Sequence, residues 1–299
     1  RCKVNNRPHY EKIKAAIENP LSKGDVAVLK EILKEYDGWI KGLDSIKSKG
    51  DDKVREMVQL LNQYKDKVEV ELILGKGSSF LIRQKGQLKL DNSIMEEFLI
   101  RLMGSEIIAE LKGVEFITGP NNAFLSLSFR PQNFSELENK PDVVLKTKDC
   151  DFVLGKEVHY KFSSNKEFTK DKTTTGSMAL AVLAAECKIN LDKTMFQECC
   201  GTAARLKAGV PYAKYFAMVE FLDMTPEDCR LTELDNVFLI RKAKRLPFEK
   251  RNNLEQVKIH RKKHPIDSEV IIKFVNEVRE FLGAKWYDSN AAMERGSFN

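Results

Sequence analysis

The sequence predicts an α/β (α+β) fold: a mixed β-sheet flanked by helices and preceded by a helical N-terminal region. Three observations lead to this prediction. Apolar residues recur at helical spacing up to about residue 115, and alternating apolar and polar residues begin near Phe116. A strand, a helix and another apolar strand then follow one another over residues 178–222. Such a strand–helix–strand unit is typical of a sheet with parallel neighbours.

The composition is that of an ordinary globular protein, with 42% hydrophobic and 31% charged residues in a chain of 299. No apolar run reaches the length of a membrane span, so we expect no membrane partner. The six cysteines, Cys2 and the adjacent Cys199 and Cys200 among them, form no Cys-x-x-Cys pair. This pattern indicates reduced cytoplasmic thiols that pack in a core, and neither a disulfide framework nor a zinc site.

Residues 1–115 are predicted to be mostly helical. Helical spacing of apolar residues is clearest over residues 26–40, 54–70 and 92–112. Residues 75–87 (GKGSSFLIRQKGQ) are basic and contain glycines, and we expect a surface loop there. No Gly-Lys-Ser/Thr ending follows these glycines, so a nucleotide-binding P-loop is not predicted.

Short strands separated by turns are predicted from residue 116 onward. The expected order is helix, three strands, helix and two strands, with a polar loop over residues 163–175. Asp192 has the residue type of a helix N-cap and Gly209 that of a C-cap, so a helix is expected over residues 194–207. The remaining predicted elements are strands at 123–129, 152–162, 178–188, 215–222 and 237–240 and a helix at 268–282.

The strand that begins at Met178 ends on Glu186-Cys187-Lys188. Side chains alternate along a strand, so Glu186 and Lys188 are expected on one face and Cys187 on the other. A carboxylate is a hard oxygen ligand for Mg²⁺, and an adjacent ammonium can orient water or offset phosphate charge. The pair therefore suits metal-dependent phosphodiester hydrolysis, although an ordinary ion pair at a strand end has the same spacing. Copies without a long apolar run before them stand at residues 51–53, 110–112 and 138–140.

Positive charge is concentrated between residues 241 and 263, which contain ten lysines and arginines against two acids. Such a segment can follow a phosphate backbone. A solvated face gives the same pattern, so both interpretations stay open at this point.

Four stretches carry a resemblance to a known family: LSLSFRPQN (125–133), KDCDFVLG (148–155), AAECKINLDKTMFQECCGTAARLKAGVPYAKYF (184–216) and ELDNVFLIRKAKR (233–245). Together with the order of elements, they resemble the PD-(D/E)XK nucleases, and among these the BbvCI-like group of type II restriction endonucleases. Members of that group consist of two related but different subunits that cut an asymmetric DNA site. The likeness runs in fragments over residues 123–299 and is weaker in the helical N-terminal part.

The resemblance implies a PD-(D/E)XK catalytic core over residues 116–247 with Asp151, Glu186 and Lys188 as catalytic residues. Asp151, Glu186 and the backbone carbonyl of Cys187 would bind Mg²⁺, and Lys188 would position or activate water. The choice of the first acid stays open, because Asp149, Asp142 and Asp171 are alternatives.

Further roles implied by the resemblance concern the region around this core. Gln197 and Glu198 would extend the metal's surroundings, although an exposed helix face explains them equally well. The expected partners are double-stranded DNA and either a second, related subunit or a second copy of the chain, in the bacterial cytoplasm. A DNA-recognition subunit that does not cut and a structure-selective nuclease are the alternatives. Residues 1–115 are expected to clamp DNA or contact a subunit, and residues 248–299 to form a basic segment and a closing helix. The expected phosphate contacts are Arg205, Lys207, Lys242, Lys244 and Arg245.

Overall fold

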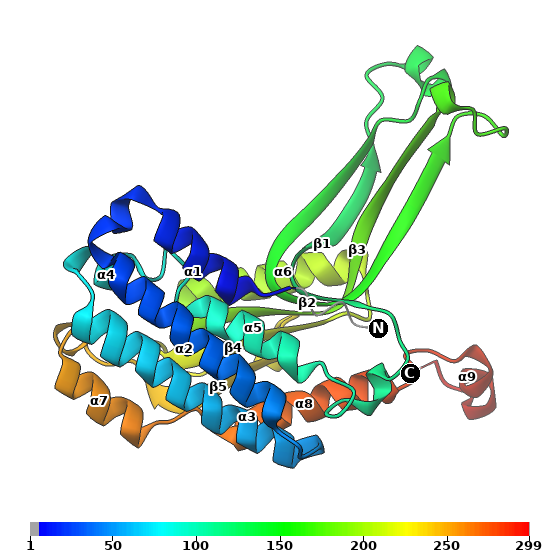
Figure 1. Cartoon of the computed structure of the whole chain (residues 1–299). Coiled ribbons are helices and arrows are strands. Elements are labelled where there is room, and N and C mark those ends of the chain that lie inside the picture. The colour runs from blue at the N-terminus through cyan, green and yellow to red at the C-terminus, as the bar shows by residue number, and fades with distance from the viewer. Residues whose placement is uncertain (1–5, 299) are drawn as a thin grey trace.

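A five-stranded mixed sheet lies at the centre of the computed structural model, which describes residues 6–298; Cys2 lies outside the described residues. The strand order is β1-β2-β3-β4-β5, antiparallel from β1 to β3 and parallel from β3 to β5 (Figure 1). The predicted mixed sheet is thereby confirmed. The strands are β1 (Ile117–Phe129), β2 (Val143–Ser163), β3 (Thr173–Leu191), β4 (Lys214–Leu222) and β5 (Asn236–Lys244).

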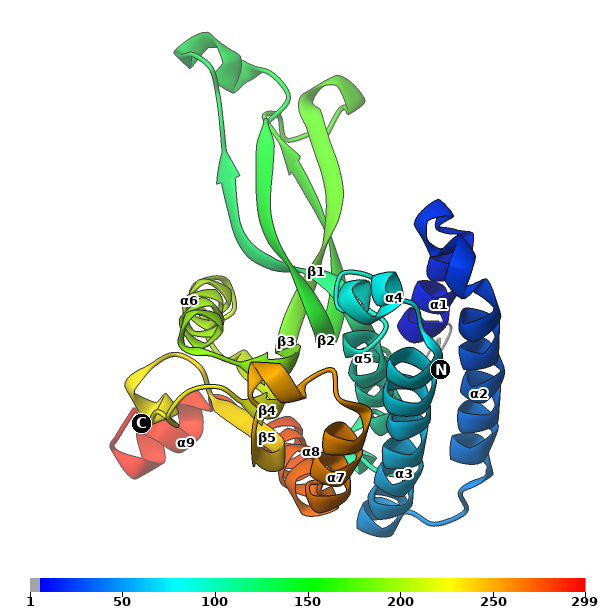
Figure 2. The ribbon, with the colours of Figure 1, turned by 90° about the vertical axis from the view of Figure 1, so that its left-hand side faces the viewer.

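Helices cover both faces of the sheet. The N-terminal helices and α8 pack on one face, whereas α6 packs on the other (Figure 2). Buried residues form one cluster in each interface, so the body has three layers. The helices are α1 (Pro8–Glu18), α2 (Val26–Ser45), α3 (Gly50–Lys65), α4 (Ser79–Gln84), α5 (Asn92–Leu102), α6 (Lys193–Gly209), α7 (Leu254–Lys263), α8 (Ser268–Gly283) and α9 (Ser289–Arg295).

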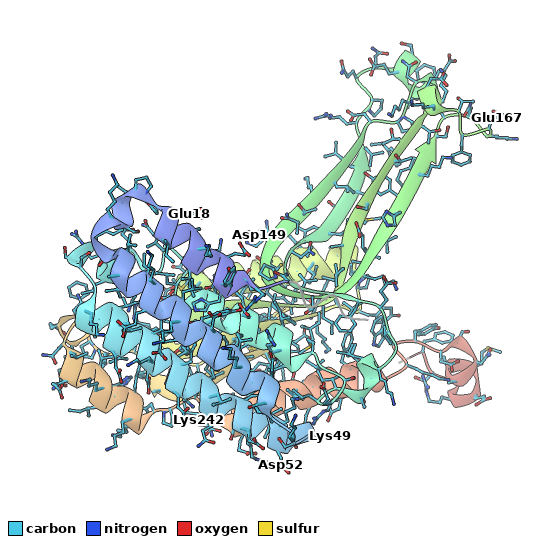
Figure 3. All side chains as sticks on the ribbon, in the orientation of Figure 1. Glu18, Lys49, Asp52, Asp149, Glu167 and Lys242 are labelled. Atoms are coloured by element: carbon cyan, nitrogen blue, oxygen red, sulfur yellow. The ribbon has the colours of Figure 1, made fainter. Side chains whose placement is uncertain are left out.

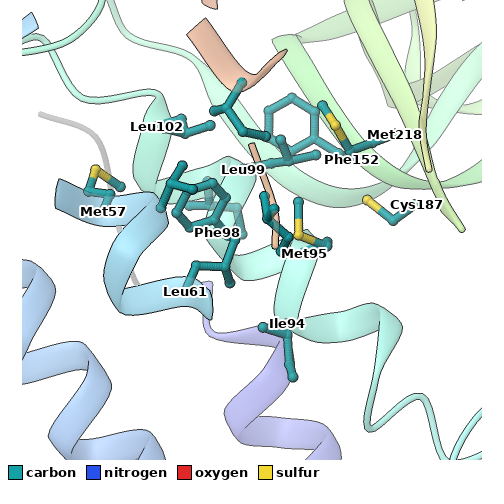
Figure 4. Close-up of a cluster of buried hydrophobic side chains, with 14 of the residues drawn as sticks. Met57, Leu61, Ile94, Met95, Phe98, Leu99, Leu102, Phe152, Cys187 and Met218 are labelled. Atoms are coloured by element: carbon teal, nitrogen blue, oxygen red, sulfur yellow. The ribbon is translucent and has the colours of Figure 1, made fainter. Parts of the chain in front are cut away.

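Helix α5 lies in the middle of the larger cluster. It is buried on nearly all sides, and the buried residues include Ser93, Glu96 and Glu97 as well as apolar ones. Phe98 and Leu99 lie in a cluster with Phe152 of β2 and Cys187 of β3 (Figure 4). The same cluster includes residues of α2, α3 and α8, so side chains from all three predicted regions of the chain share one core.

The first three strands extend beyond the body as an arm (Figure 1). Strand β2 pairs with β1 through its first part and with β3 through its second, and the loops 130–142 and 164–172 meet at the tip. There the hydroxyl of Ser164 donates to the Glu138 carbonyl over 3.1 Å. The ring of the exposed Phe129 packs edge to face against that of the half-buried Phe162, with centroids 5.4 Å apart. The strands were predicted to be short, and this prediction was wrong. They are long because β2 pairs with both β1 and β3 along the arm.

Several helices differ from the predicted ones. The helix predicted to end at residue 70 continues through a π-helical segment, Asp66–Leu74. The predicted loop 75–87 contains α4. The N-cap of this helix is Ser78, whose hydroxyl accepts from the amides of Phe80 and Leu81. Helix α5 ends at Leu102, ten residues before the predicted end. Helix α1 lies in the region predicted to be mostly helical, whereas α7 and α9 had no counterpart in the prediction.

Helix α6 begins as predicted. The Asp192 carboxylate accepts from the amide of Met195 over 2.9 Å, which confirms the N-cap. Gly209, however, is the last helical residue and not the predicted cap. A Cβ at this position would lie 2.1 Å from the Leu125 carbonyl oxygen, so glycine allows the close approach of α6 to β1.

Five charged side chains are buried where the helical layer meets the sheet. The Lys65 ammonium lies 2.5 Å from Glu69 and 2.7 Å from Glu220 of β4. Glu220 also accepts from Arg241 of β5 over 2.7 Å, and Glu69 pairs with Arg261 of α7. Burial opposes ionisation of Glu220, but Lys65 and Arg241 outweigh it and hold its pKa below the ordinary value. Two arginines of the predicted basic segment are therefore structural.

No helix among residues 6–298 is long and apolar enough to cross a membrane. The cysteines in this range are free, and Cys199 is buried between α6 and the sheet. Burial is the main reason why the pKa values of Cys150 and Cys199 are raised to about 12. Cys199 is accordingly a packing residue, as predicted, and the buried Cys150 is one as well.

We predict that Glu220→Gln lowers the free energy of unfolding by about 3–5 kcal/mol, because it leaves Lys65 and Arg241 buried without their full counter-charge. Urea unfolding followed by circular dichroism measures this change. The matched control is Glu71→Gln, which breaks an exposed pair with Lys67 and should leave the free energy of unfolding nearly unchanged. Equal losses in the two variants would contradict a dominant role for the buried network.

Candidate active site

The candidate site lies where β2 and β3 separate. Their antiparallel register ends at the pair Phe152–Ala185, so Asp151 and Glu186 are the next residues of the two strands. On the other side of β2, Pro120 alone lies opposite both Asp151 and Phe152, which makes a β-bulge. Bulges redirect side chains, and here the bulge turns the Asp151 carboxylate toward β3.

The Asp151 side chain is held against β3 by the backbone of that strand. Its Oδ2 accepts from the Cys187 amide over 3.0 Å. Its Oδ1 lies 3.2 Å from the ammonium of Lys89, which precedes α5. Asp151 thus binds to the residue between the predicted acid and the predicted lysine, and its side chain is 15% exposed.

Glu186 and Lys188 lie on the face of β3 toward α6, whereas Cys187 enters the core beneath the N-terminal helices. The predicted alternation is confirmed. The two charged groups are 3.0 Å apart, and the buried Tyr215 hydroxyl of β4 donates to Glu186 over 2.9 Å. Lys148 of β2 lies 4.0 Å from the same carboxylate. Glu186 is therefore fixed by a donor on each side.

The protonation states of Lys188 and Tyr215 follow from this geometry. Burial disfavours the charged ammonium, but Glu186, helped by Asp151, outweighs burial and raises the pKa of Lys188. Burial, reinforced by Glu186, also raises the pKa of Tyr215. Both groups consequently remain protonated at neutral pH and act as hydrogen-bond donors to the carboxylate.

Tyr215, Lys148, Lys89 and Glu96 were not predicted as residues of the site. Glu96 of α5 is buried, and its Oε1 lies 3.6 Å from the Lys89 ammonium that also contacts Asp151. Burial and the nearby Asp151 charge raise the pKa of Glu96 to about 7. The sequence does contain a signal for Glu96. The pair Glu96-Glu97 lies inside an otherwise apolar helix, and a carboxylate is rarely buried without a partner.

The other candidates for the first acid lie elsewhere. Asp142 is exposed and pairs with Arg130 at the tip of the arm, over 3.0 Å. Asp171 is exposed in the second tip segment, where it is hydrogen-bonded to Thr169. Asp149 is exposed at the base of the arm (Figure 3). Of the four aspartates, Asp151 is the one that contacts β3 at the Glu186–Lys188 pair.

Gln197 and Glu198 are exposed on α6. Within residues 6–298, neither has a hydrogen bond or an ion pair with Glu186 or Lys188. Their predicted place around a metal stays a prediction.

The five predicted phosphate contacts have different environments. Arg245 lines a pocket of about 500 Å³ together with Lys188, Arg83 and Arg251. Lys207 is tied to Asp235 over 2.9 Å, whereas Lys242 pairs with Asp267 on the far side of the body (Figure 3). The remaining two, Arg205 and Lys244, are exposed.

The carboxylate oxygens at the site are suitable ligands for Mg²⁺. Among residues 6–298 no three or more His, Cys, Asp or Glu side chains are arranged as a ready metal cluster. Mg²⁺ does not need one, because it binds through one or two carboxylates and keeps several waters. Asp151 and Glu186 could supply these hard oxygens, and the Cys187 amide holds Asp151 against the strand that carries Glu186.

Comparison with known proteins gives two findings. The family model described as Bpu10I restriction endonuclease matches residues 87–298. A solved structure described as the native BbvCI A2B2 tetramer at low resolution has a TM-score of 0.69 and 19% sequence identity. The match covers 95% of this chain and 100% of that one. No curated protein sequence matches the chain.

We predict that Asp151→Asn weakens Mn²⁺ binding by about tenfold or more, since it removes a ligand charge and keeps the shape. Asp142→Asn is the isosteric control and should bind as the wild type does, because Asp142 pairs with Arg130 at the arm tip. Titration calorimetry without DNA measures both affinities. A loss in Asp142→Asn and none in Asp151→Asn would reverse the assignment of the first acid.

Proposed function

Because the chain belongs to the Bpu10I restriction endonuclease family, a family of site-specific nucleases, we propose that it is a subunit of a type II restriction endonuclease. It hydrolyses phosphodiester bonds of double-stranded DNA with Mg²⁺ and cuts one strand of a specific, asymmetric site. The observation that carries this proposal is the contact of Glu186 with Lys188, 3.0 Å, next to an Asp151 bound to the intervening amide.

Each residue of the site has its own role in the in-line attack of water on the scissile phosphate. Bound Mg²⁺ supplies a Lewis acid that polarises the scissile phosphate and acidifies a nearby water. Asp151 and Glu186 hold the cation, and the Tyr215 hydroxyl keeps the Glu186 carboxylate in one orientation. Lys188 remains an ammonium, so it orients the attacking water and offsets charge on the phosphate.

The duplex lies at the base of the arm, where the strands carrying Asp151 and Glu186 separate. The basic pocket beside Lys188, lined by Arg83, Arg245 and Arg251, receives phosphates that flank the scissile one. Arg205 and Lys244, which are exposed, add further phosphate contacts. Lys207 and Lys242 would contact DNA only by leaving Asp235 and Asp267.

We place one catalytic centre in each chain, so a double-strand break requires two chains. The second is a related but different subunit, and the A2B2 composition of the similar BbvCI structure supports this arrangement. Residues 1–115 contribute the surface for the partner subunit or for clamping DNA, and residues 248–299 contribute basic groups and the closing helix α8.

We predict that Lys188→Met lowers strand cleavage by about 10²–10⁴-fold and leaves the affinity for DNA within about threefold, because the ammonium acts at the reacting phosphate. Single-turnover nicking assays and filter binding on the same DNA separate the two effects. The control Lys49→Met removes an exposed lysine at the opposite end of the body (Figure 3) and should behave as the wild type does.

Normal cleavage by Lys188→Met would refute the role of the lysine. DNA binding by the wild type without cleavage under any metal would favour the alternative of a recognition subunit that does not cut. Nicks placed by DNA shape and not by sequence would instead indicate a structure-selective nuclease.

A further inference from the structure

The basic pocket beside Lys188 is larger than a phosphate group alone requires. Its volume is about 500 Å³, and it lies where two parallel strands end, with Asn190 of β3 and Phe221 of β4 in its lining. Pockets of about 300–1,000 Å³ hold whole small molecules. In open α/β sheets such molecules bind outside the carboxyl ends of the strands. The size and the place of the pocket therefore suit a ligand with more than one chemical group.

Positive charge in the pocket calls for an anion. Arg245 and Arg251 share one carboxylate, that of Asp223, at 3.7 Å and 3.4 Å. Arg83 and Lys85 line the same pocket, and neither forms an ion pair within residues 6–298. An arginine fork matches the geometry of a phosphate, so one part of the ligand is a phosphate group.

Two acids also line the pocket, but neither cancels this charge. Glu69 is buried and pairs with Lys65 and with Arg261, which lines the pocket too. Asp91 is buried, and burial is the main reason why its pKa is raised. Its Oδ1 accepts from the backbone amide of Asn92 over 2.8 Å. The surplus of positive charge in the pocket therefore remains.

Ring surface in the pocket suits a planar apolar group. Phe248 belongs to the lining although it is 79% exposed. The turn that carries it is braced, because Arg251 donates from its side chain to the Leu246 carbonyl over 2.8 Å and from its amide to the Phe248 carbonyl over 3.3 Å. The rings of Phe221 and His260, with centroids 5.1 Å apart, line the same pocket. An exposed ring on a braced turn is a platform on which a nucleobase can stack.

The side chain of Asn92 lines the pocket without a partner. Its Oδ1 is buried and makes no hydrogen bond within the described part of the chain. The side chain is half-buried, so a half-turn of the amide about the Cβ–Cγ bond turns this acceptor toward the pocket. The oxygens of an ionised phosphate only accept hydrogen bonds, whereas the amino groups of nucleobases donate them. An unsatisfied acceptor next to arginines thus indicates a base in addition to a phosphate.

We propose that this pocket binds one nucleotide with an unpaired base, its phosphate held by the arginines and its base stacked on Phe248. The nucleotide is either a free mononucleotide or one unit of a DNA strand that has left the duplex, and the chemistry of recognition is the same for both. For the second source the inference rests on the proposed function. Lys188 lines the pocket as well as the candidate active site, so the extruded unit would be a neighbour of the scissile phosphate.

Titration calorimetry on the full chain, without metal or DNA, tests the pocket itself. The probes are 5′-deoxyadenosine monophosphate, deoxyribose 5-phosphate and inorganic phosphate. We expect the nucleotide to bind about tenfold or more tightly than the two probes that lack a base. Phe248→Ala should abolish this difference and keep the affinity for inorganic phosphate within about twofold of the wild type, because it removes only the ring.

The matched control for this experiment is Phe134→Ala. It removes a ring that is 88% exposed at the tip of the arm and does not line the pocket. This variant should bind all three probes as the wild type does. Circular dichroism shows that both variants are folded.

A second experiment distinguishes the two sources of the nucleotide. Duplexes that contain the site mapped by cleavage, each with one mismatch beside the cut, are compared with the fully paired duplex by filter binding without Mg²⁺. A mismatch lowers the cost of extrusion, so an extruded unit predicts that one mismatched duplex binds about tenfold more tightly and that Phe248→Ala loses this gain. Equal affinities for all duplexes, with tight binding of the mononucleotide, would identify the free mononucleotide as the occupant.

A mononucleotide that binds no more tightly than inorganic phosphate, or one that binds Phe248→Ala as it binds the wild type, would overturn the inference. Mg²⁺-dependent nicking by the wild type would then show that the proposed function stands without it. Tight binding of the mononucleotide that is lost in Phe248→Ala, by a chain that never nicks DNA, would support the pocket and contradict the proposed function.

Discussion

The buried ion network around Lys65 is the interaction on which the rest of the arrangement depends. Lys65 pairs with Glu69 on its own helix and with Glu220 of the sheet, and Arg261 ties α7 to Glu69. Charges inside a core must be matched closely, because an unpaired one costs far more than an apolar residue would. This requirement fixes the helical layer on the sheet. It thereby places α5, and with it Glu96, over the end of β3.

The arrangement of Glu186 and Lys188, and the start of the helix after them, could be predicted from sequence because they follow from local rules. Strand alternation places Glu186 and Lys188 on one face, and Asp192 has the side chain that caps α6. Asp151 needed the resemblance for its role, since nothing local separates it from Asp149. The deciding feature is a bulge on β2, which depends on the partner strand.

The features that could not be predicted depend on partners remote in the sequence. Arg241 and Arg261 read as part of a basic surface, but Glu220 and Glu69 draw them into the core. The sequence of the arm is typical of short strands and a loop. The arm has no thick core, so the alternating residues of its strands are only half buried. Glu96 has no basic neighbour on its own helix face, and its partner Lys89 precedes the helix in a left-handed turn.

The central claim is that this chain cuts DNA at a defined sequence with a divalent cation. The most direct measurement is to incubate the purified chain with a supercoiled plasmid of known sequence, with and without Mg²⁺, and to map every product end. We expect Mg²⁺-dependent nicks on one strand of a recurring asymmetric site, and double-strand breaks there if two copies act together. Ends that share no sequence, or cutting that persists without any divalent metal, would contradict the claim.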